Sequence, residues 1–291
     1  MSTTPYSLLD RVEENRRLLA RLRIIPALLT GLVIGGGVAV LAAWWLGAVG
    51  CLVGLAVAVL LGTVVYLYFP KLSESEVRKA FLEAGPASEE LFPRYHNLME
   101  SLTIGSGVPK PTLHVLVADG LNLAVYGPEG GEVVVATTAL LAQLDRIELE
   151  GVLAAALVRI ASLDAQLGTQ LASRFAGTLI MHGPSVGPTQ LTPGKAHRRA
   201  AKIAAALGEQ RDLLADLGAV DITRYPPGLG SALAKIEARG SVVDSATWGT
   251  AHCWLVNPLP SDGPSQAIAQ LNEAFGEREK VSTRVALMAE L

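Results

Sequence analysis

Hydrophobic residues are concentrated near the start of the chain. Between Ile24 and Pro70 the sequence contains no Asp, Glu, Lys or Arg. One membrane-spanning helix needs about 20 apolar residues, so this run is too long for one helix and suits two. Trp44 and Trp45 suit a membrane–water interface and mark the turn between the helices. We therefore predict a transmembrane hairpin over residues 24–70, with spans at about 24–45 and 49–69.

Basic residues at both ends of the hairpin predict its orientation. Five arginines precede the first span, and Lys71, Arg78 and Lys79 follow the second, whereas the turn is uncharged. Because basic flanks stay in the cytoplasm, we expect a basic N-terminal helix over 1–23 and a domain over 71–291, both cytoplasmic. This describes a multi-pass protein of the plasma (inner) membrane with both termini inside. A cleaved signal peptide is the alternative, but its apolar core is shorter and no second span follows at once.

After the hairpin, the spacing of apolar residues changes from helical to extended and back. Helical stripes cover 73–85 and 88–102, and short β-branched runs at 112–117 and 133–136 predict strands. A short helix is expected over 138–144. The pattern therefore predicts an α+β domain that is mainly helical and contains a small sheet.

A longer helix begins near Arg146. Asp145 followed three residues later by Glu148 resembles a capping box, which would start the helix. Its apolar positions recur at helical spacing: Val152, Leu153, Leu157, Ile160 and Leu163. We expect this helix to be buried or half-buried in the domain.

Composition and charge exclude several kinds of function. The net charge is −3, only 18% of residues are charged, and no basic face stands out, so we expect no nucleic-acid partner. Cys51 and Cys253 lie far apart in unlike surroundings, so neither a disulfide nor a cysteine metal site is expected. The five histidines show no pair at metal-ligand spacing: His96, His114, His182, His197 and His252.

Several short motifs occur in a specific order along the chain. They are Pro109-x-Pro111, Asn122 with Gly127, Thr137-Thr138, Glu148-Leu-Glu-Gly-Val-Leu153, Arg211-Asp-Leu-Leu-Ala-Asp216 and His252 to Pro258. With the hairpin, this order resembles the HtpX-like and CAAX-prenyl-endopeptidase family of membrane zinc peptidases over most of the chain. The resemblance implies a zincin-like (gluzincin) domain, in which a His-Glu-x-x-His helix and a later Glu hold zinc.

At the zinc positions implied by the resemblance, the required side chains are missing. Ala155 and Arg159 stand in place of the two histidines, Ala156 in place of the glutamate base, and Asp212 in place of the third ligand. Catalytic zinc needs three protein ligands and a water. Alanine offers no donor atom, and a guanidinium repels a dication. We therefore predict no catalytic residue, no bound zinc and no other cofactor.

Other positions match the scaffold that surrounds the family's site. The resemblance assigns supporting roles to Asp164, Arg211, Asp216 and His252, and it places a candidate ligand cleft between the Asn122 strand region and the long helix.

Two segments depart from the family. Residues 276–279 replace a Thr-His-Pro, and the uncharged, proline-containing stretch 175–194 predicts a loop in place of further membrane helices.

We therefore predict a membrane-anchored pseudo-peptidase that binds, scaffolds or regulates a peptide, a protein partner or further copies of itself. An active zinc endopeptidase with non-standard ligands and a purely assembling membrane component are the alternatives. A buried Arg159–Asp212 ion pair could replace the metal as the link between two helices, with help from Asp164 or Asp216. The opposing interpretation is that Arg159 points to solvent.

Overall fold

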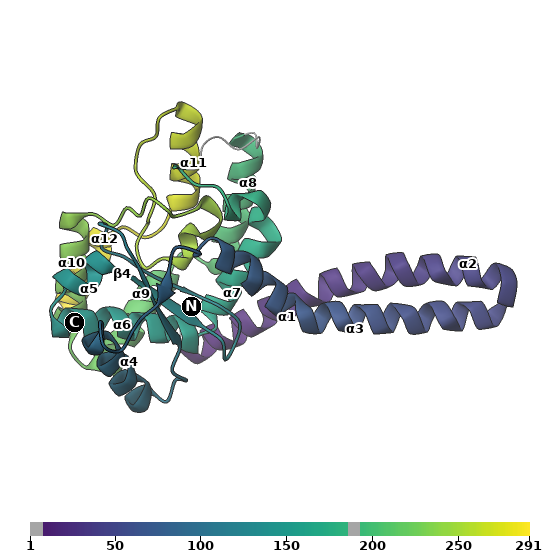
Figure 1. Cartoon of the computed structure of the whole chain (residues 1–291), viewed down its shortest axis with the longest axis horizontal. Coiled ribbons are helices and arrows are strands. Elements are labelled where there is room, and N and C mark those ends of the chain that lie inside the picture. Colours follow the sequence, from purple (N-terminus) through teal and green to yellow (C-terminus); the bar gives the residue numbers. More distant parts are fainter. Residues whose placement is uncertain (1–7, 186–192) are drawn as a thin grey trace, which may run out of the picture.

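The apolar run forms two long antiparallel helices in the computed structural model, which describes residues 8–185 and 193–291 (Figure 1). The first helix is continuous through α1 (Leu8–Thr30), a π-helical turn η1 (Gly31–Gly35) and α2 (Gly36–Leu46). Gly47, with φ +53°, reverses the chain into α3 (Ala48–Lys79). Both helices are long and apolar enough to cross a membrane, as the sequence predicted.

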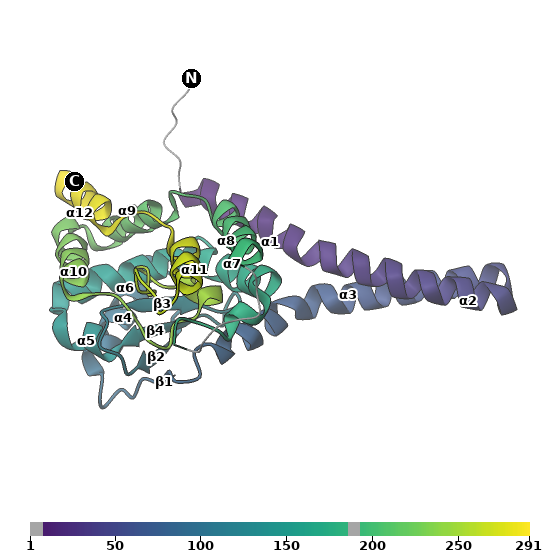
Figure 2. The same cartoon turned by 90° about the horizontal axis from the view of Figure 1, so that it is seen from above.

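The helices continue beyond the bilayer into the domain. They contain 39 and 32 residues, so they measure about 58 and 48 Å, against about 30 Å for a hydrocarbon core. Their surplus length carries the basic ends into contact with the domain, from which the hairpin projects in both views (Figures 1 and 2).

Small residues let the two helices of the hairpin pack closely. A Cβ atom added to Gly35 would lie 2.4 Å from Cβ of Ala58, and one added to Gly54 would lie 2.3 Å from Cβ of Ala39. Gly36 has no such neighbour within 4 Å. Gly35 therefore faces the partner helix, whereas Gly36 does not.

A small mixed sheet forms one side of the domain. Its strands are β1 (Gly85–Pro86), β2 (Thr112–Leu116), β3 (Leu123–Tyr126) and β4 (Val133–Thr137), in the order β1-β2-β4-β3. Strands β2 and β4 are parallel, and β3 is antiparallel to β4. The two predicted strands are confirmed. The pattern did not delimit β3, because all four of its residues are buried and no alternation marks it.

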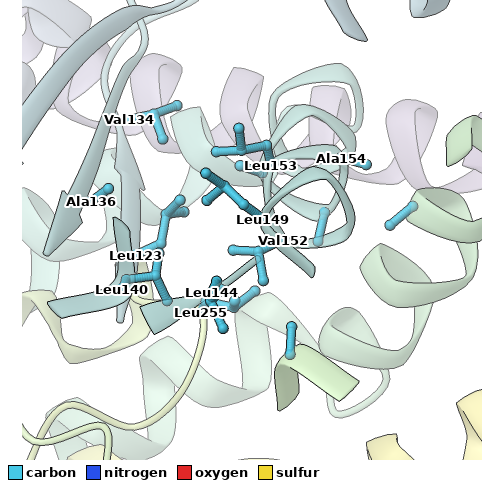
Figure 3. Close-up of a cluster of buried hydrophobic side chains, with 14 of the residues drawn as sticks. Leu123, Val134, Ala136, Leu140, Leu144, Leu149, Val152, Leu153, Ala154 and Leu255 are labelled. Carbon is cyan, nitrogen blue, oxygen red and sulfur yellow. The ribbon is translucent and has the colours of Figure 1, made fainter. Parts of the chain in front are cut away.

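The predicted long helix is α6 (Arg146–Ala161), and it lies at the centre of the domain. Its predicted capping box is present, with Asp145 and Glu148 bonding each other's backbone N–H groups. It packs against β3, α4 (Pro93–Ser106), α9 (Arg211–Thr223) and α10 (Pro226–Arg239). Figure 3 shows its leucine and valine side chains meeting those of the sheet, for example Leu149 and Leu123.

The helix that follows bends away from α6 by 70°. Leu163 makes the bend with φ +63°, which is uncommon for a non-glycine residue. Beyond it lie α7 (Asp164–Leu171), a π-helical turn η2 (Ala172–Ala176) and a 3₁₀ turn η3 (Gly177–Ile180). The short helix expected over 138–144 is α5 (Thr138–Gln143).

The remaining elements complete the α+β, mainly helical architecture. They are α8 (Pro193–Leu207), a 3₁₀ turn η4 (Trp248–Cys253), α11 (Gln266–Gly276) and α12 (Val281–Glu290). The loop expected over 175–194 is wrong at both ends, where η2, η3 and α8 are helical, and its residues 186–192 lie outside the described part. The helix expected from residue 88 begins at Pro93, whose fixed φ suits a first helical position.

Candidate functional site

The positions that would carry zinc chemistry lie in the interior of the domain. Ala155 and Ala156 are fully buried on α6, within the main hydrophobic core. Arg159 lies one turn later and is 1% exposed, and Asp212, in the first turn of α9, is 2% exposed. Helices α6 and α9 pack side by side, so the four positions gather between them.

Arg159 and Asp212 form the ion pair that the sequence suggested. Nη2 of Arg159 donates to Oδ1 of Asp212 at 2.6 Å, and Nη1 donates to the carbonyl oxygen of Trp254 at 2.9 Å. The interpretation in which Arg159 points to solvent is therefore wrong. A buried guanidinium needs such charge-assisted bonds, because an unpaired buried charge costs several kcal/mol.

A second guanidinium, from Arg278, binds the same carboxylate. Its Nη2 lies 2.7 Å from both carboxylate oxygens of Asp212, and its Nε lies 2.9 Å from Oδ2. Its Nη1 donates to the carbonyl oxygen of Trp254 at 2.9 Å, so that oxygen accepts from two arginines. Hereafter Arg159, Arg278 and Asp212 are called the arginine cluster.

Sequence reasoning did not identify Arg278. It lies between α11 and α12, in the segment 276–279 that departs from the family's pattern. The one feature that could have drawn attention to Arg278 is that it lies in the segment where the family resemblance expects a histidine. Its position beside Asp212 depends on a contact across 66 residues, which no local pattern reveals.

The charges of the arginine cluster oppose metal binding. Burial by itself raises the pKa of Asp212, but Arg278 and Arg159 hold that pKa below its ordinary range, so the carboxylate stays ionised. Burial lowers the pKa of Arg159 to about 9, although Asp212 opposes the shift. Because a guanidinium stays protonated at neutral pH, two arginines and one carboxylate give the cluster a net positive charge, which repels a dication.

Asn122, which was expected beside a ligand cleft, lies in the interior of the domain. Its side chain is fully buried, and its Nδ2 donates to the carbonyl oxygens of Ser241 at 2.9 Å and Val256 at 3.0 Å. The backbone N–H of Leu255 donates to the carbonyl of Leu123 at 2.7 Å. The segment 254–256 thus covers the edge of β3, where the cleft was expected.

Asp164 holds two other arginines, so it does not assist Arg159. Its Oδ1 accepts from Nη2 of Arg11 at 3.0 Å and from Nδ2 of Asn15 at 2.9 Å. Its Oδ2 accepts from Nε of Arg211 at 3.2 Å. We call Arg11, Asn15, Asp164 and Arg211 the Asp164 cluster. It joins α1, at the base of the hairpin, to α7 and α9.

Asp216 pairs with Arg284 and likewise does not assist Arg159. Their side chains are both 0% exposed, and two bonds of 2.7 and 2.8 Å join them. Nη1 of Arg284 also donates to the carbonyl of Leu255 at 2.8 Å. Arg159, Arg278 and Arg284 together therefore hold the backbone at Trp254 and Leu255 in place.

His252 bonds to α7 and to Arg211 of the Asp164 cluster. Its Nε2 lies 2.9 Å from the carbonyl oxygen of Gly168, and its own carbonyl accepts from Nη1 of Arg211 at 2.9 Å. Burial and the nearby cation of Arg211 lower the pKa of His252 to about 3, so its ring is neutral. Among the described residues, no three His, Cys, Asp or Glu side chains gather in a way that could hold a metal ion.

An apolar hairpin ahead of a helical domain with these motifs defines a membrane protein related to peptidases. The chain is 32% identical to the Protease HtpX homolog of Dictyoglomus thermophilum over 276 residues, which cover 88% of each protein. It therefore belongs to the HtpX family of membrane proteases.

Other relatives support this assignment. The chain is 27% identical to the Protease HtpX homolog of Dictyoglomus turgidum, over 98% of this chain and 96% of the relative. It is 29% identical to that of Streptococcus agalactiae, over 72% and 79% respectively. No protein-family model matches the chain. No solved structure matches it either.

Proposed function

We propose that this chain is a membrane-anchored pseudo-peptidase that acts by binding, scaffolding or regulating a partner. The observation that carries the proposal is the bonding of Arg159 and Arg278 to Asp212, where the family resemblance implies a zinc ligand. Both carboxylate oxygens are occupied by guanidinium groups, so neither has a lone pair directed at an open metal position.

The chemistry of peptide hydrolysis supports the same conclusion. A zinc peptidase needs ligands that lower the pKa of a bound water and a base that accepts its proton. Ala155 supplies no ligand atom and Ala156 no base. His252 is engaged with the carbonyl of Gly168. The donors present therefore do not fit zinc, and we derive no hydrolytic step for this site.

Under this proposal, the arginine cluster links the helices that a zinc ion would link in a zinc-binding peptidase of this type. It joins α6, α9 and the segment ahead of α12 by charge-assisted bonds. Such a cluster orients these elements without any exchangeable ion. The domain then offers a fixed surface rather than a reactive centre, and its partner is a peptide, a protein or a further copy of the chain.

Metal analysis of the full-length protein, purified in detergent without chelators, tests the proposal. We expect far less than one zinc per chain by plasma mass spectrometry and no cleavage of an unfolded model protein such as casein in added zinc. Stoichiometric zinc that is lost in Asp212→Asn, but kept in the exposed control Asp221→Asn, would establish the alternative of an active peptidase with non-standard ligands.

A search for partners tests the positive half of the proposal. Pull-down from detergent-solubilised membranes should recover a specific protein or peptide, and native mass measurement should reveal any homo-oligomer. The basic flanks of the hairpin further lead us to propose cytoplasmic termini and a cytoplasmic domain. Protease digestion of right-side-out and inverted vesicles checks this orientation, since only inverted vesicles should then expose the domain.

A further inference from the structure

We propose that the domain rests against anionic phospholipid headgroups through a basic surface on α8 and η2. This basic surface consists of Arg174, Lys195, Arg198 and Lys202, all of which are exposed. The proposal depends on the membrane hairpin and is independent of whether the domain retains catalytic activity.

The sequence of α8 gives it two unlike faces. Four basic residues and no acidic residue lie between Pro193 and Leu207. Its apolar positions Ala196, Ala200 and Ile203 are buried, in contact with α7, α11 and η2. The apolar face is therefore used inside the domain, and only the cationic face is available to a partner. That arrangement favours an electrostatic contact over insertion into the bilayer.

The position of α8 brings its cations toward the membrane. Ser173 of η2 donates to Glu76 of α3 at 2.8 Å. Lys71 is the first charged residue after the apolar run, and Glu76 follows it by five residues. This spacing corresponds to about 7.5 Å along the helix. Arg199 of α8 donates to the carbonyl of Ala176 in η2 at 2.9 Å. The chain of contacts thus connects α8 through η2 to the membrane end of the hairpin.

The figures agree with this placement. In both views α8 lies in the half of the domain from which the hairpin leaves, and it runs across the hairpin's long axis (Figures 1 and 2). A helix in that orientation is roughly parallel to a bilayer that the hairpin crosses. Its exposed cations can then meet headgroups along its length.

The cations of the basic surface have no acidic partner among the described residues. Within residues 8–185 and 193–291, no carboxylate lies within 4.0 Å of a charged nitrogen of Arg174, Lys195, Arg198 or Lys202. Lys202 lies instead over the ring of Phe175, 5.8 Å from its centroid. Near an anionic leaflet, each such cation strengthens association by about fivefold.

A fluorescent label on α8 of the full-length protein tests the proposal. Ala201 is exposed beside Arg198 and serves as the labelling site, whereas Ala238 on α10 lies far from the hairpin and serves as the control. Cys51 is first replaced by Ser because it is exposed, while Cys253 is buried. The labelled protein is reconstituted into vesicles of phosphatidylcholine alone or with phosphatidylglycerol, each carrying a headgroup quencher.

We expect quenching at position 201 to increase with phosphatidylglycerol and to be reversed by high salt, whereas position 238 should not respond. Lys195→Glu, Arg198→Glu and Lys202→Glu together should weaken docking by on the order of a hundredfold. The matched triple reversal of Arg146, Arg224 and Arg239, which are exposed elsewhere on the domain, should leave it unchanged.

Equal quenching at position 201 in neutral and anionic vesicles, or quenching in neither, would overturn the proposal. If quenching is absent in both kinds of vesicle, and an acidic protein is captured only when the basic surface is intact, these cations bind a protein partner instead. If the triple variant folds poorly, the salt titration of the labelled protein without these substitutions still decides the test.

Discussion

The arginine cluster and the Asp164 cluster each contain one aspartate and two arginines, but they join different parts of the molecule. In each, one buried aspartate binds two guanidinium groups. The partners of Asp212 come from α6 and from the segment ahead of α12, both within the domain. The partners of Asp164 come from α9 and from α1, whose continuation enters the apolar hairpin.

Burial does not separate the two clusters. The side chains of Arg159 and Arg278 are 1% and 14% exposed, and those of Arg11 and Arg211 are 7% and 8% exposed. The clusters differ in what they join: the arginine cluster links elements of the domain, and the Asp164 cluster is a joint between the hairpin and the domain. The same charge pattern therefore links helices within the domain in one place and attaches the apolar hairpin to the domain in another.

Removing the central carboxylate of the arginine cluster should have the largest effect. Asp212→Ala leaves the buried guanidinium of Arg159 and the partly exposed one of Arg278 without a counter-charge, and we expect it to lower the free energy of unfolding by about 3–5 kcal/mol. Denaturant unfolding in detergent measures the change. The control Asp221→Ala alters an exposed residue of the same helix and should cost less than about 0.5 kcal/mol. Equal losses in the two variants would contradict the proposed role of the cluster.

Removing Asp164 should have a smaller and more local effect. Arg11 and Arg211 retain the carbonyl oxygens of Leu207 and His252 as acceptors, so we expect Asp164→Ala to cost about 2–3 kcal/mol. Hydrogen exchange should accelerate in the first turns of α1 before it does so in α6. Simultaneous loss of protection in both helices would show that Asp164 supports the core rather than the joint.

The buried His252, beside the Asp164 cluster, should make stability depend on pH. The pKa of His252 is about 3 in the folded protein and about 6.5 when unfolded, so between these values the unfolded chain binds the extra proton. Stability should therefore rise with pH from 4 to 6, by up to about 1.4 kcal/mol per pH unit from this residue. His252→Gln should flatten the unfolding profile, whereas His197→Gln at an exposed site should not. An unchanged slope in His252→Gln would refute this.

Removing the second arginine of the cluster should have the smallest effect. In Arg278→Met, Arg159 still neutralises Asp212 and the repulsion between two cations disappears. We expect a change of less than about 1 kcal/mol in the free energy of unfolding, in either direction, because a desolvated charge is exchanged for an apolar group. Denaturant midpoints measure it. A loss as large as that of Asp212→Ala would mean that Arg278, rather than Arg159, supplies the essential counter-charge.

The sequence predicted those features that depend on neighbouring residues. The uncharged run from residue 24 to 70, the capping box at Asp145 and the strands around 114 and 135 each follow from local spacing or composition. The Arg159–Asp212 pair was one of two interpretations of Arg159, because the family resemblance assigned both residues to one site. The structure selects the pair over the solvent-facing side chain.

Other parts of the site could not be predicted from local patterns. Arg11 contacts Asp164 across 153 residues and Arg278 contacts Asp212 across 66, and neither pair shares a sequence motif. The helical turns after residue 172 were missed because glycines and prolines nearby favoured a loop. Segment 254–256 reaches the edge of β3 through a backbone bond from Leu255 to Leu123, a contact between distant segments that no local pattern reveals.

From the sequence alone we could predict an apolar helical hairpin and a central helix that carries Ala155 and Arg159 where the family resemblance implies zinc ligands. The surroundings of these two residues depend on the tertiary structure. Burial makes an unpaired charge costly, so Arg159 and Asp212 must find partners, and the identity of those partners depends on which distant segments the fold brings beside them. This packing brings Arg278 to Asp212, and it places the carbonyl oxygen of Trp254 where both Arg159 and Arg278 donate to it.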